Sequence, residues 1–303
     1  MSYKQSIVRD LSSIKDFIRW TYSQFQKSDI YYGHGTDNPW DEAVQLVMGA
    51  LKLPLDFDRD MLDCALCYNE KKHILKLVHL RTTKRQPLPY LLGEAWFMGL
   101  PFKVTTDTLI PRSPIVALLE NEFSPWLTSY PQYILDMCTG SGCLGISAAL
   151  VFEDAEVDIT DISEAALVVA NDNILRHEVE DRVQAIHSDM FTALDQNKKY
   201  DLIICNPPYV DAVDFREAPK EFHNEPQLAL TSGDDGLEFT HKFLAQAAHY
   251  LSDDGILVYE VGNTEVALQA AYPNTAFMWV DLEQGGNGVF ILTKQQLSEL
   301  TQE

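Results

Sequence analysis

From residue 133 onward, short apolar runs alternate with stretches whose apolar residues recur at helical spacing. Such alternation is typical of a mainly parallel sheet with helices on both faces, so it predicts an α/β fold for this part of the chain. The predicted strands are residues 133–138, 155–160, 183–188, 201–205, 256–261, 276–282 and 289–293. The helices predicted between them are residues 143–151, 164–176, 237–251 and 264–271.

The last two predicted strands are joined by residues 283–288, a glycine-rich connection. This connection is too short for a crossover helix, so the two strands should pair antiparallel. We therefore expect a seven-stranded sheet whose last strand is antiparallel to the others.

The chain before this sheet is expected to be helical. Apolar residues recur at helical spacing over residues 7–25 and 59–82, and Asn38 can cap a helix over residues 39–51 that has a proline at its first position. Residues 93–104 are aromatic, β-prone and interrupted by glycine, which predicts a hairpin. The predicted organisation is a helical domain (residues 1–90), a hairpin connector (91–114) and an α/β domain (115–303).

The formal net charge of −22 is unusual for a chain of 303 residues. An acidic surface repels phosphate backbones, so binding to DNA or RNA as a main task is not expected. The charge favours a basic partner, or it is an adaptation to solubility or salt. The first residues lack the pattern of a signal peptide, and no window approaches the ~20 apolar residues of a membrane span. We therefore expect a cytoplasmic protein without a membrane partner.

Five cysteines without an export signal indicate reduced thiols. Cys64 and Cys67 have CxxC spacing, but there is no second pair and no suitably spaced histidine, so we expect buried, small apolar side chains. His177, His187 and His241 are scattered, and we expect them to make local or surface hydrogen bonds. No metal is expected.

Glycines follow the first predicted strand at positions 140, 142 and 145, and Asp161 follows the second strand. Glycines here let a ligand approach the amides of a helix amino terminus, and a carboxylate at the second strand can bind a ribose. A nicotinamide dinucleotide and S-adenosylmethionine both suit this geometry.

Three further features separate the two ligands. A carboxylate at Asp136 suits the cationic amino-acid end of S-adenosylmethionine but would repel a pyrophosphate. Asp189 and Met190 follow the third strand, where a carboxylate can accept from an adenine amino group and a thioether can pack on its ring. The fourth strand ends in residues 206–209, and ligands of such sheets bind across the carboxyl ends of the strands. Each feature alone also fits a tight turn or a helix cap, but four at successive strand ends favour a ligand site.

The fourth strand end reads Asn206-Pro207-Pro208-Tyr209. Two prolines restrict the backbone and remove two donors, which leaves the carbonyls of Asn206 and Pro207 outside a regular ladder. A rigid group of acceptors beside a ring suits a planar group that carries an NH2.

Together these motifs resemble those of class I S-adenosylmethionine-dependent methyltransferases, and specifically the bacterial protein-glutamine N5-methyltransferase family. The resemblance covers nearly the whole chain. It implies a seven-stranded Rossmann-like sheet, a helical amino-terminal domain that recognises the substrate, and S-adenosyl-L-methionine as the cofactor, with S-adenosyl-L-homocysteine as product. The matching motifs are residues 93–95, 110–112, 136–142, 161–163, 206–209, 225–226 and 236–237.

The family has two main branches. The branch that modifies peptide-chain release factors typically reads Pro-Arg-Pro-Glu-Thr after the hairpin, whereas residues 111–115 of this chain read Pro-Arg-Ser-Pro-Ile. The latter is similar to the branch that modifies a glutamine of ribosomal protein L-three of the large subunit. This resemblance implies a basic ribosomal protein as substrate, and the acidity of the chain fits, because opposite potentials speed encounter.

The resemblance also implies residue roles. The Asn206 side-chain oxygen and the Pro207 carbonyl would accept hydrogen bonds from the glutamine NH2, with Pro208 beside them and Tyr209 packed against the amide plane. Glu225 would help to shape the substrate pocket, and the loop at residues 210–232 would cover the substrate. The implied cofactor-binding residues are Asp136, Thr139, Gly140, Gly142, Asp161, Ile162, Asp189, Met190 and Asn206.

Other functions fit parts of the sequence. Release factors are the next substrate to consider. Adenine amino-methylation in DNA uses a similar turn, but the charge of −22 and the lack of a basic strip argue against it. A ribosome-assembly factor without turnover is a third alternative, and the intact strand-end residues speak against it.

Overall fold

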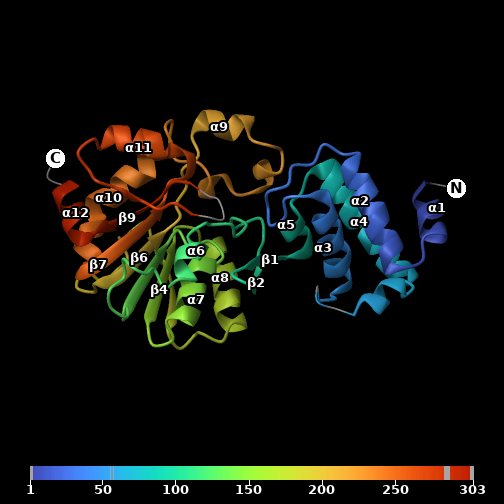
Figure 1. Cartoon of the computed structure of the whole chain (residues 1–303), viewed down its shortest axis with the longest axis horizontal. Coiled ribbons are helices and arrows are strands. Elements are labelled where there is room, and N and C mark those ends of the chain that lie inside the picture. The colour runs from blue at the N-terminus through green and yellow to red at the C-terminus, as the bar shows by residue number, and fades with distance from the viewer. Residues whose placement is uncertain (1–2, 55, 57, 283–286, 301–303) are drawn as a thin grey trace. The chain divides into compact units, whose positions relative to one another are not determined.

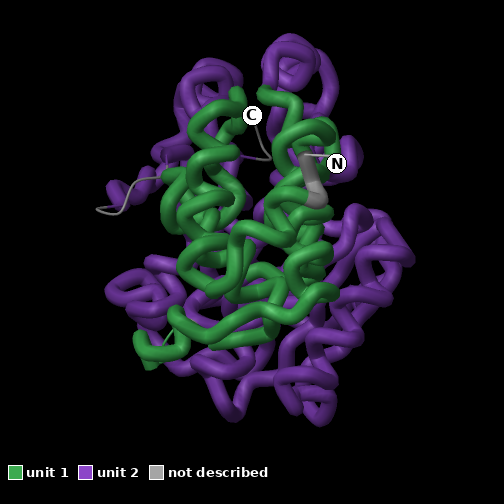
Figure 2. The backbone as a smooth tube through the Cα atoms, turned by 90° about the vertical axis from the view of Figure 1, so that its right-hand side faces the viewer, with its two compact units in different colours: residues 1–95, 219–224 green, residues 96–218, 225–303 purple. Residues whose placement is uncertain are grey.

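The computed structural model describes residues 3–54, 56, 58–282 and 287–300. The chain forms two compact units (Figure 2). Unit 1 comprises residues 1–95 together with residues 219–224, and unit 2 comprises residues 96–218 and 225–303. The unit boundary thus differs from the predicted one at residue 90, and a six-residue piece of the predicted substrate loop belongs to the helical unit.

Unit 1 is helical. Its core joins Phe17, Leu46, Val47 and Ile74, which come from three different helices. As predicted, Asn38 caps one helix by accepting from the backbone amides of residues 40 and 41. The helical elements are α1 (Tyr3–Asp10), α2 (Ile14–Gln26), α3 (Pro39–Leu51), η1 (Arg59–Asp63), α4 (Tyr68–Lys84), α5 (Leu88–Leu92) and η2 (Phe222–Asn224).

The single helix predicted over residues 7–25 is wrong, because α1 ends at Asp10 and α2 starts at Ile14. The reason is a capping box. The Ser13 hydroxyl accepts from the Asp16 amide at 3.3 Å, and the Asp16 carboxylate accepts from the Ser13 amide at 3.0 Å.

The helix predicted over residues 59–82 is also interrupted. Residues 64–67 are not helical, because they run beside the α1–α2 junction and exchange backbone hydrogen bonds with Ser12 and Ile14. Cys64 and Cys67 lie in this segment and are exposed, so the expectation that they are buried is wrong.

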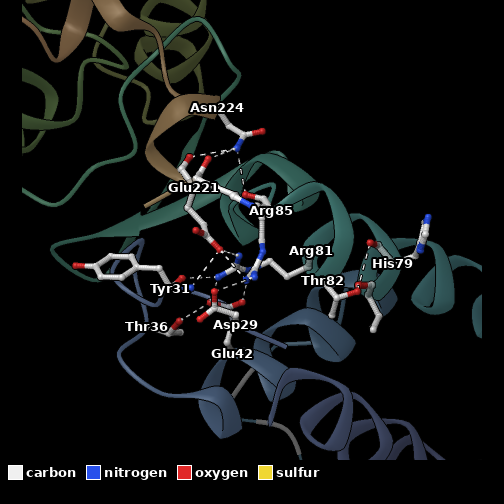
Figure 3. Close-up of polar contacts among 12 residues, drawn as sticks. Asp29, Tyr31, Thr36, Glu42, His79, Arg81, Thr82, Arg85, Glu221 and Asn224 are labelled. Carbon is white, nitrogen blue, oxygen red and sulfur yellow. Dashed lines mark hydrogen bonds and ion pairs between the residues drawn. The ribbon is translucent and has the colours of Figure 1, made fainter. Parts of the chain in front are cut away.

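Residues 219–224 join unit 1 through a buried guanidinium (Figure 3). Arg81 is 1% exposed and donates to Glu42 at 2.5 Å, to Glu221 at 3.0 Å and to the carbonyl of Tyr31 at 2.8 Å. A buried charge needs such partners, since an unpaired one would cost several kcal/mol. The Arg81 cluster (Arg81, Glu42, Glu221) therefore fixes the inserted segment within unit 1.

Unit 2 is built on a seven-stranded sheet in the order β5-β4-β3-β6-β7-β9-β8 (Figure 1). The first five of these strands are parallel, and β9 pairs antiparallel with both β7 and β8. The predicted fold class is confirmed. The strands are β3 (Tyr133–Met137), β4 (Glu156–Asp161), β5 (Val183–His187), β6 (Tyr200–Cys205), β7 (Leu251–Glu260), β8 (Met278–Trp279) and β9 (Val289–Thr293).

The strand predicted over residues 276–282 is shorter than expected, because only two residues of β8 pair with β9. The predicted connection at 283–288 lies mostly outside the described residues, which resume at residue 287. The predicted hairpin is present as β1 (Glu94–Phe97) and β2 (Leu100–Lys103).

Helices cover both faces of the sheet, so its central strands are apolar on both sides. Ile134 and Leu202 belong to the core that includes residues of α7 and α8, whereas Leu135 and Ile203 belong to the core that includes residues of α10 and α12. The helices and turns of unit 2 are α6 (Val116–Leu119), α7 (Cys143–Val151), α8 (Glu164–Arg176), α9 (Ala212–Glu217), η3 (Gln227–Ala229), α10 (Glu238–Tyr250), η4 (Gly262–Thr264), α11 (Glu265–Ala271) and α12 (Lys294–Leu300). No helix in the described part of the chain is long and apolar enough to span a bilayer.

Candidate active site

A cavity of about 180 Å³ lies at the carboxyl ends of β3, β4, β5 and β6, within unit 2. All four predicted strand ends contribute to it, as expected for a sheet of this kind. The predicted site residues that line it are Gly140, Asp161, Ile162, Asp189, Met190, Asn206 and Pro208. The predicted residues not among its lining are Asp136, Thr139, Gly142, Pro207, Tyr209 and Glu225.

Asp161 holds the loop that follows β3. One carboxylate oxygen accepts from the Gly140 amide and the other from the Ser163 amide, both at 2.9 Å. Burial raises the pKa of Asp161, and the hydrogen bonds from these amides act in the opposite direction. Gly140 has a φ of +57°, a conformation that glycine adopts without strain. A carboxylate at this strand end can accept from the hydroxyls of a ribose.

Asp136 lies behind the cavity and is 1% exposed. Its Oδ2 atom accepts from the Thr139 hydroxyl at 2.5 Å and from the Gly145 amide at 2.9 Å. A Cβ at Gly145 would lie 2.3 Å from a side-chain carbon of Ile159, so glycine is required there. Asp136 therefore braces the glycine loop, in addition to its predicted electrostatic role.

The second oxygen of Asp136, Oδ1, has no hydrogen-bond partner among the described residues. Burial raises the pKa of Asp136 to about 7, although the Thr139 hydroxyl and Gly145 amide oppose this shift. A cationic group nearby would stabilise the carboxylate. This unpaired buried oxygen fits the α-ammonium group at the amino-acid end of S-adenosyl-L-methionine.

The turn after β6 is held on both sides. Tyr209 donates its backbone amide to the Leu230 carbonyl at 3.1 Å, and its hydroxyl to Glu260 at 2.9 Å. Its ring lies against Gly262, where a Cβ would be 2.5 Å from the ring carbon Cε2. Asn206 and Pro208 face the cavity from the same turn. The turn thus presents the Asn206 amide from a fixed backbone.

Glu225 was expected to shape the substrate pocket, but it makes a different contact. Its side chain is fully buried and accepts from the Ile110 amide at 3.1 Å and from Arg112 at 2.8 Å. Glu225 therefore ties the loop after β6 to the Pro-Arg-Ser-Pro segment, and it does not line the cavity.

Sequence reasoning missed several residues of the site. Leu109, Leu228 and Phe239 line the cavity from a loop, from η3 and from α10. Glu260 contacts Tyr209 but lies, in the sequence, inside the predicted strand at residues 256–261. The one sequence signal for a role of Glu260 is that a charged residue directly follows the apolar run Ile256–Tyr259.

The three histidines make local contacts, as predicted. His177 lies 3.1 Å from the Pro101 carbonyl, His187 lies 2.9 Å from the Ile162 carbonyl, and His241 lies 2.8 Å from the Tyr272 hydroxyl. Within the described ranges, no three His, Cys, Asp or Glu residues are arranged to hold a metal ion.

The charge is divided unequally between the units. Unit 1 contains 14 Lys and Arg residues against 13 Asp and Glu residues, whereas unit 2 contains 9 against 32. The acidity of the protein therefore resides in the unit that holds the cavity.

Comparison with known proteins identifies the family of the chain. The family model "Methyltransferase small domain" matches residues 118–291. A ribosomal protein uL3 glutamine methyltransferase of Francisella tularensis is 45% identical over 296 residues, which cover 97% of this chain and 94% of the relative. The protein of the same name from Bordetella pertussis is 41% identical over 292 residues, covering 96% and 98%.

Among solved structures, the catalytic domain of hMettl16 in complex with a MAT2A 3′UTR hairpin has a TM-score of 0.53 and 14% sequence identity, covering 82% of this chain and 89% of that one. This likeness bears on the fold alone. The two curated relatives match over nearly their full lengths, so the chain belongs to the family of ribosomal protein uL3 glutamine methyltransferases.

Proposed function

We propose that this protein transfers a methyl group from S-adenosyl-L-methionine to the side-chain amide nitrogen of a glutamine in ribosomal protein uL3, the L-three protein of the sequence analysis. The observation that carries the proposal is the position of Asn206. Its amide lies at the edge of the cavity, on a turn that two prolines and Tyr209 hold in place.

The cofactor would lie across the strand ends. When bound, S-adenosyl-L-methionine supplies an electrophilic methyl group on a sulfonium and is released as S-adenosyl-L-homocysteine. Asp161 would accept from its ribose, and Asp189 and Met190 would hold the adenine. Thr139, Gly140 and Gly142 would present the glycine loop to the amino-acid end, with Asp136 as the nearby negative charge. Ile162, which is 49% exposed and lines the cavity, would pack on the ligand.

The acceptor is an amide nitrogen, whose lone pair is delocalised into the carbonyl. The Asn206 side-chain oxygen and the Pro207 carbonyl would accept from its two hydrogens and fix its direction. Catalysis would then come mainly from positioning and electrostatics. No strong base is needed first, because the proton becomes acidic after methylation and leaves to solvent or to these acceptors.

The charge distribution supports a basic protein substrate. Unit 2 carries the whole excess of acidic residues, so it would attract a basic ribosomal protein towards the cavity and repel nucleic acid. A ribosomal substrate also places the reaction in the cytoplasm. We assign recognition of the substrate surface to unit 1, whose charges nearly balance.

The test is methylation of purified uL3 with labelled cofactor, followed by mass spectrometry of the labelled peptide. We expect label on one glutamine of uL3 and none on a release factor. Asn206→Ala should lower kcat by about 10²–10³-fold, while the cofactor Kd changes far less. Asn171→Ala, on the surface of α8, is the matched control. Label on a release factor instead, or on nucleic acid, would overturn the assignment.

Recognition by unit 1 needs a gentler test than removal of residues 1–90, because such a deletion would also leave Glu221 without Arg81. Trp40 and Tyr68 are exposed aromatic residues of unit 1. Their replacement by alanine should raise the KM for uL3 and leave the cofactor Kd unchanged. An unchanged KM in both variants would argue against a role of this surface.

A further inference from the structure

Glu260 is a buried carboxylate with no part in the reaction described above. It ends β7, the strand next to β6, and is 4% exposed. Its Oε1 accepts from the Tyr209 hydroxyl at 2.9 Å, and its Oε2 accepts from the Ser113 hydroxyl at 2.6 Å. Each oxygen thus has one hydroxyl donor.

This arrangement is costly for the fold. Arg112, which acts on Glu260 electrostatically, forms an ion pair with Glu225 at 2.8 Å. Burial raises the pKa of Glu260, while Ser113, Tyr209 and Arg112 oppose that shift. An apolar side chain would fill the same place at lower cost. The carboxylate therefore serves to fix the positions of the Tyr209 and Ser113 hydroxyls.

Tyr209 is the side chain that this carboxylate orients. Its ring contacts Gly262, and its carbonyl lies where a Cβ at Gly236 would be 2.3 Å away. Burial and the Glu260 carboxylate raise the pKa of Tyr209, so the hydroxyl remains a donor. Because the hydroxyl donates a hydrogen bond to Glu260, the Tyr209 ring is held in one orientation.

We propose that Glu260 and Ser113 are positioning residues for methyl transfer: they fix the Tyr209 ring and, through Pro207 and Pro208, the Asn206 amide at the cavity. This inference deepens the proposed function and rests on it. Neither residue touches the reacting atoms. Their contribution comes from the shape and hydrogen bonding of Glu260, and its charge is not used in the chemistry.

A pair of substitutions at one position tests this role. In Glu260→Gln, the amide oxygen can still accept from Tyr209, and the NH2 can donate to Ser113. In Glu260→Ala both contacts are lost. We expect Glu260→Ala to lower kcat by about 10–100-fold and Glu260→Gln by less than about threefold, with the cofactor Kd within about threefold in both. Asp254→Asn, at the exposed opposite end of β7, is the matched control.

Two outcomes would overturn the proposal. If Glu260→Gln loses as much kcat as Glu260→Ala, the charge acts in the reaction. If the cofactor Kd rises by as large a factor as kcat falls, Glu260 stabilises unit 2 in general and does not specifically position Tyr209. Combining Tyr209→Phe with Glu260→Ala should cost little more kcat than the larger single effect, because both break one chain of contacts. Additive losses of kcat would contradict the idea that the two residues act through one series of contacts.

A measurement without substrate keeps the inference separate from the proposed function. In protein labelled with ¹³Cζ-tyrosine, the Tyr209 signal is assigned by its loss in Tyr209→Phe. It should shift in Ser113→Ala and in Glu260→Ala and stay in place in Asp254→Asn. An unmoved signal in the first two variants would refute the contact, whether or not uL3 is the substrate.

Discussion

Arg81 and Glu221 lie 140 positions apart in the sequence, yet the Nη1 atom of Arg81 donates to Oε1 of Glu221 at 3.0 Å (Figure 3). Both side chains are at most 2% exposed. Glu42 binds the same guanidinium from α3. The helical unit thus completes its buried charge balance with a residue of the loop that follows β6.

Arg81→Met is expected to lower the free energy of unfolding by about 3–5 kcal/mol, because Glu42 loses its cation and Glu221 keeps only Arg85, at 3.6 Å. Chemical denaturation measures this change. The double variant Arg81→Met/Glu221→Gln should recover part of the loss, since one buried charge is removed with its partner. Lys84→Ala, exposed on the same helix, serves as the control. If Arg81→Met were as stable as Lys84→Ala, the Arg81 cluster would contribute nothing to the free energy of unfolding.

Affinity for S-adenosyl-L-methionine should depend on pH through Asp136. In the ligand-free protein its pKa is raised to about 7, so below that pH the carboxyl holds a proton. A cationic ligand favours the carboxylate, and binding then releases the proton. The Kd should therefore fall by about fivefold from pH 6 to pH 7 and level off above.

Calorimetry in buffers of different ionisation enthalpy measures the released proton directly. Asp136→Asn should remove most of the pH dependence and weaken binding. The pKa of Asp161 is also raised, so the slope that remains belongs to that residue. A variant that keeps the full pH dependence would contradict the role of Asp136.

Gly262→Ala should displace the Tyr209 ring. The residue has a φ of +51°, and its Cβ would lie 2.5 Å from the ring. We expect a loss of about 2–4 kcal/mol in unfolding free energy and a clear loss of turnover. Gly99→Ala has a similar φ, +70°, but no neighbour within 4 Å, so it should cost only about 1 kcal/mol. Equal losses in the two variants would mean that the ring is not displaced.

Ionic strength should affect the encounter with the substrate protein. The excess of acidic residues lies in unit 2, so kcat/KM for uL3 should fall steeply as salt screens the attraction, while kcat at saturation changes little. Steady-state assays from low to high salt test this. A kcat/KM that is independent of salt would show that the acidic charge does not attract the substrate, and solubility would be its remaining role.

The sheet was predictable because its signals are local and repeated. The runs that became β3, β6 and β7 are apolar on both faces, and polar residues such as Asp161 and Asn206 mark the strand ends. The hairpin and the Asn38 cap are equally local.

The remaining features depend on contacts or on details of turn chemistry. Ser13 and Asp16 carried a capping-box signal that the apolar spacing of residues 7–25 concealed. Cys64 and Cys67 are exposed because their segment runs beside Ser12 and Ile14, which spacing alone does not indicate. No local pattern marks Glu221 as part of the helical unit.

The discontinuity of unit 1 has a consequence for synthesis on the ribosome. Glu42 leaves the exit tunnel before Arg81, but Glu221 follows only after β3 to β6 have been translated. At roughly 5–20 residues per second, the 140 positions between Arg81 and Glu221 take about 7–28 s. During this interval the nascent helical unit lacks one of its two buried carboxylates, so its final closure coincides with the emergence of the loop beyond the Asn206 turn.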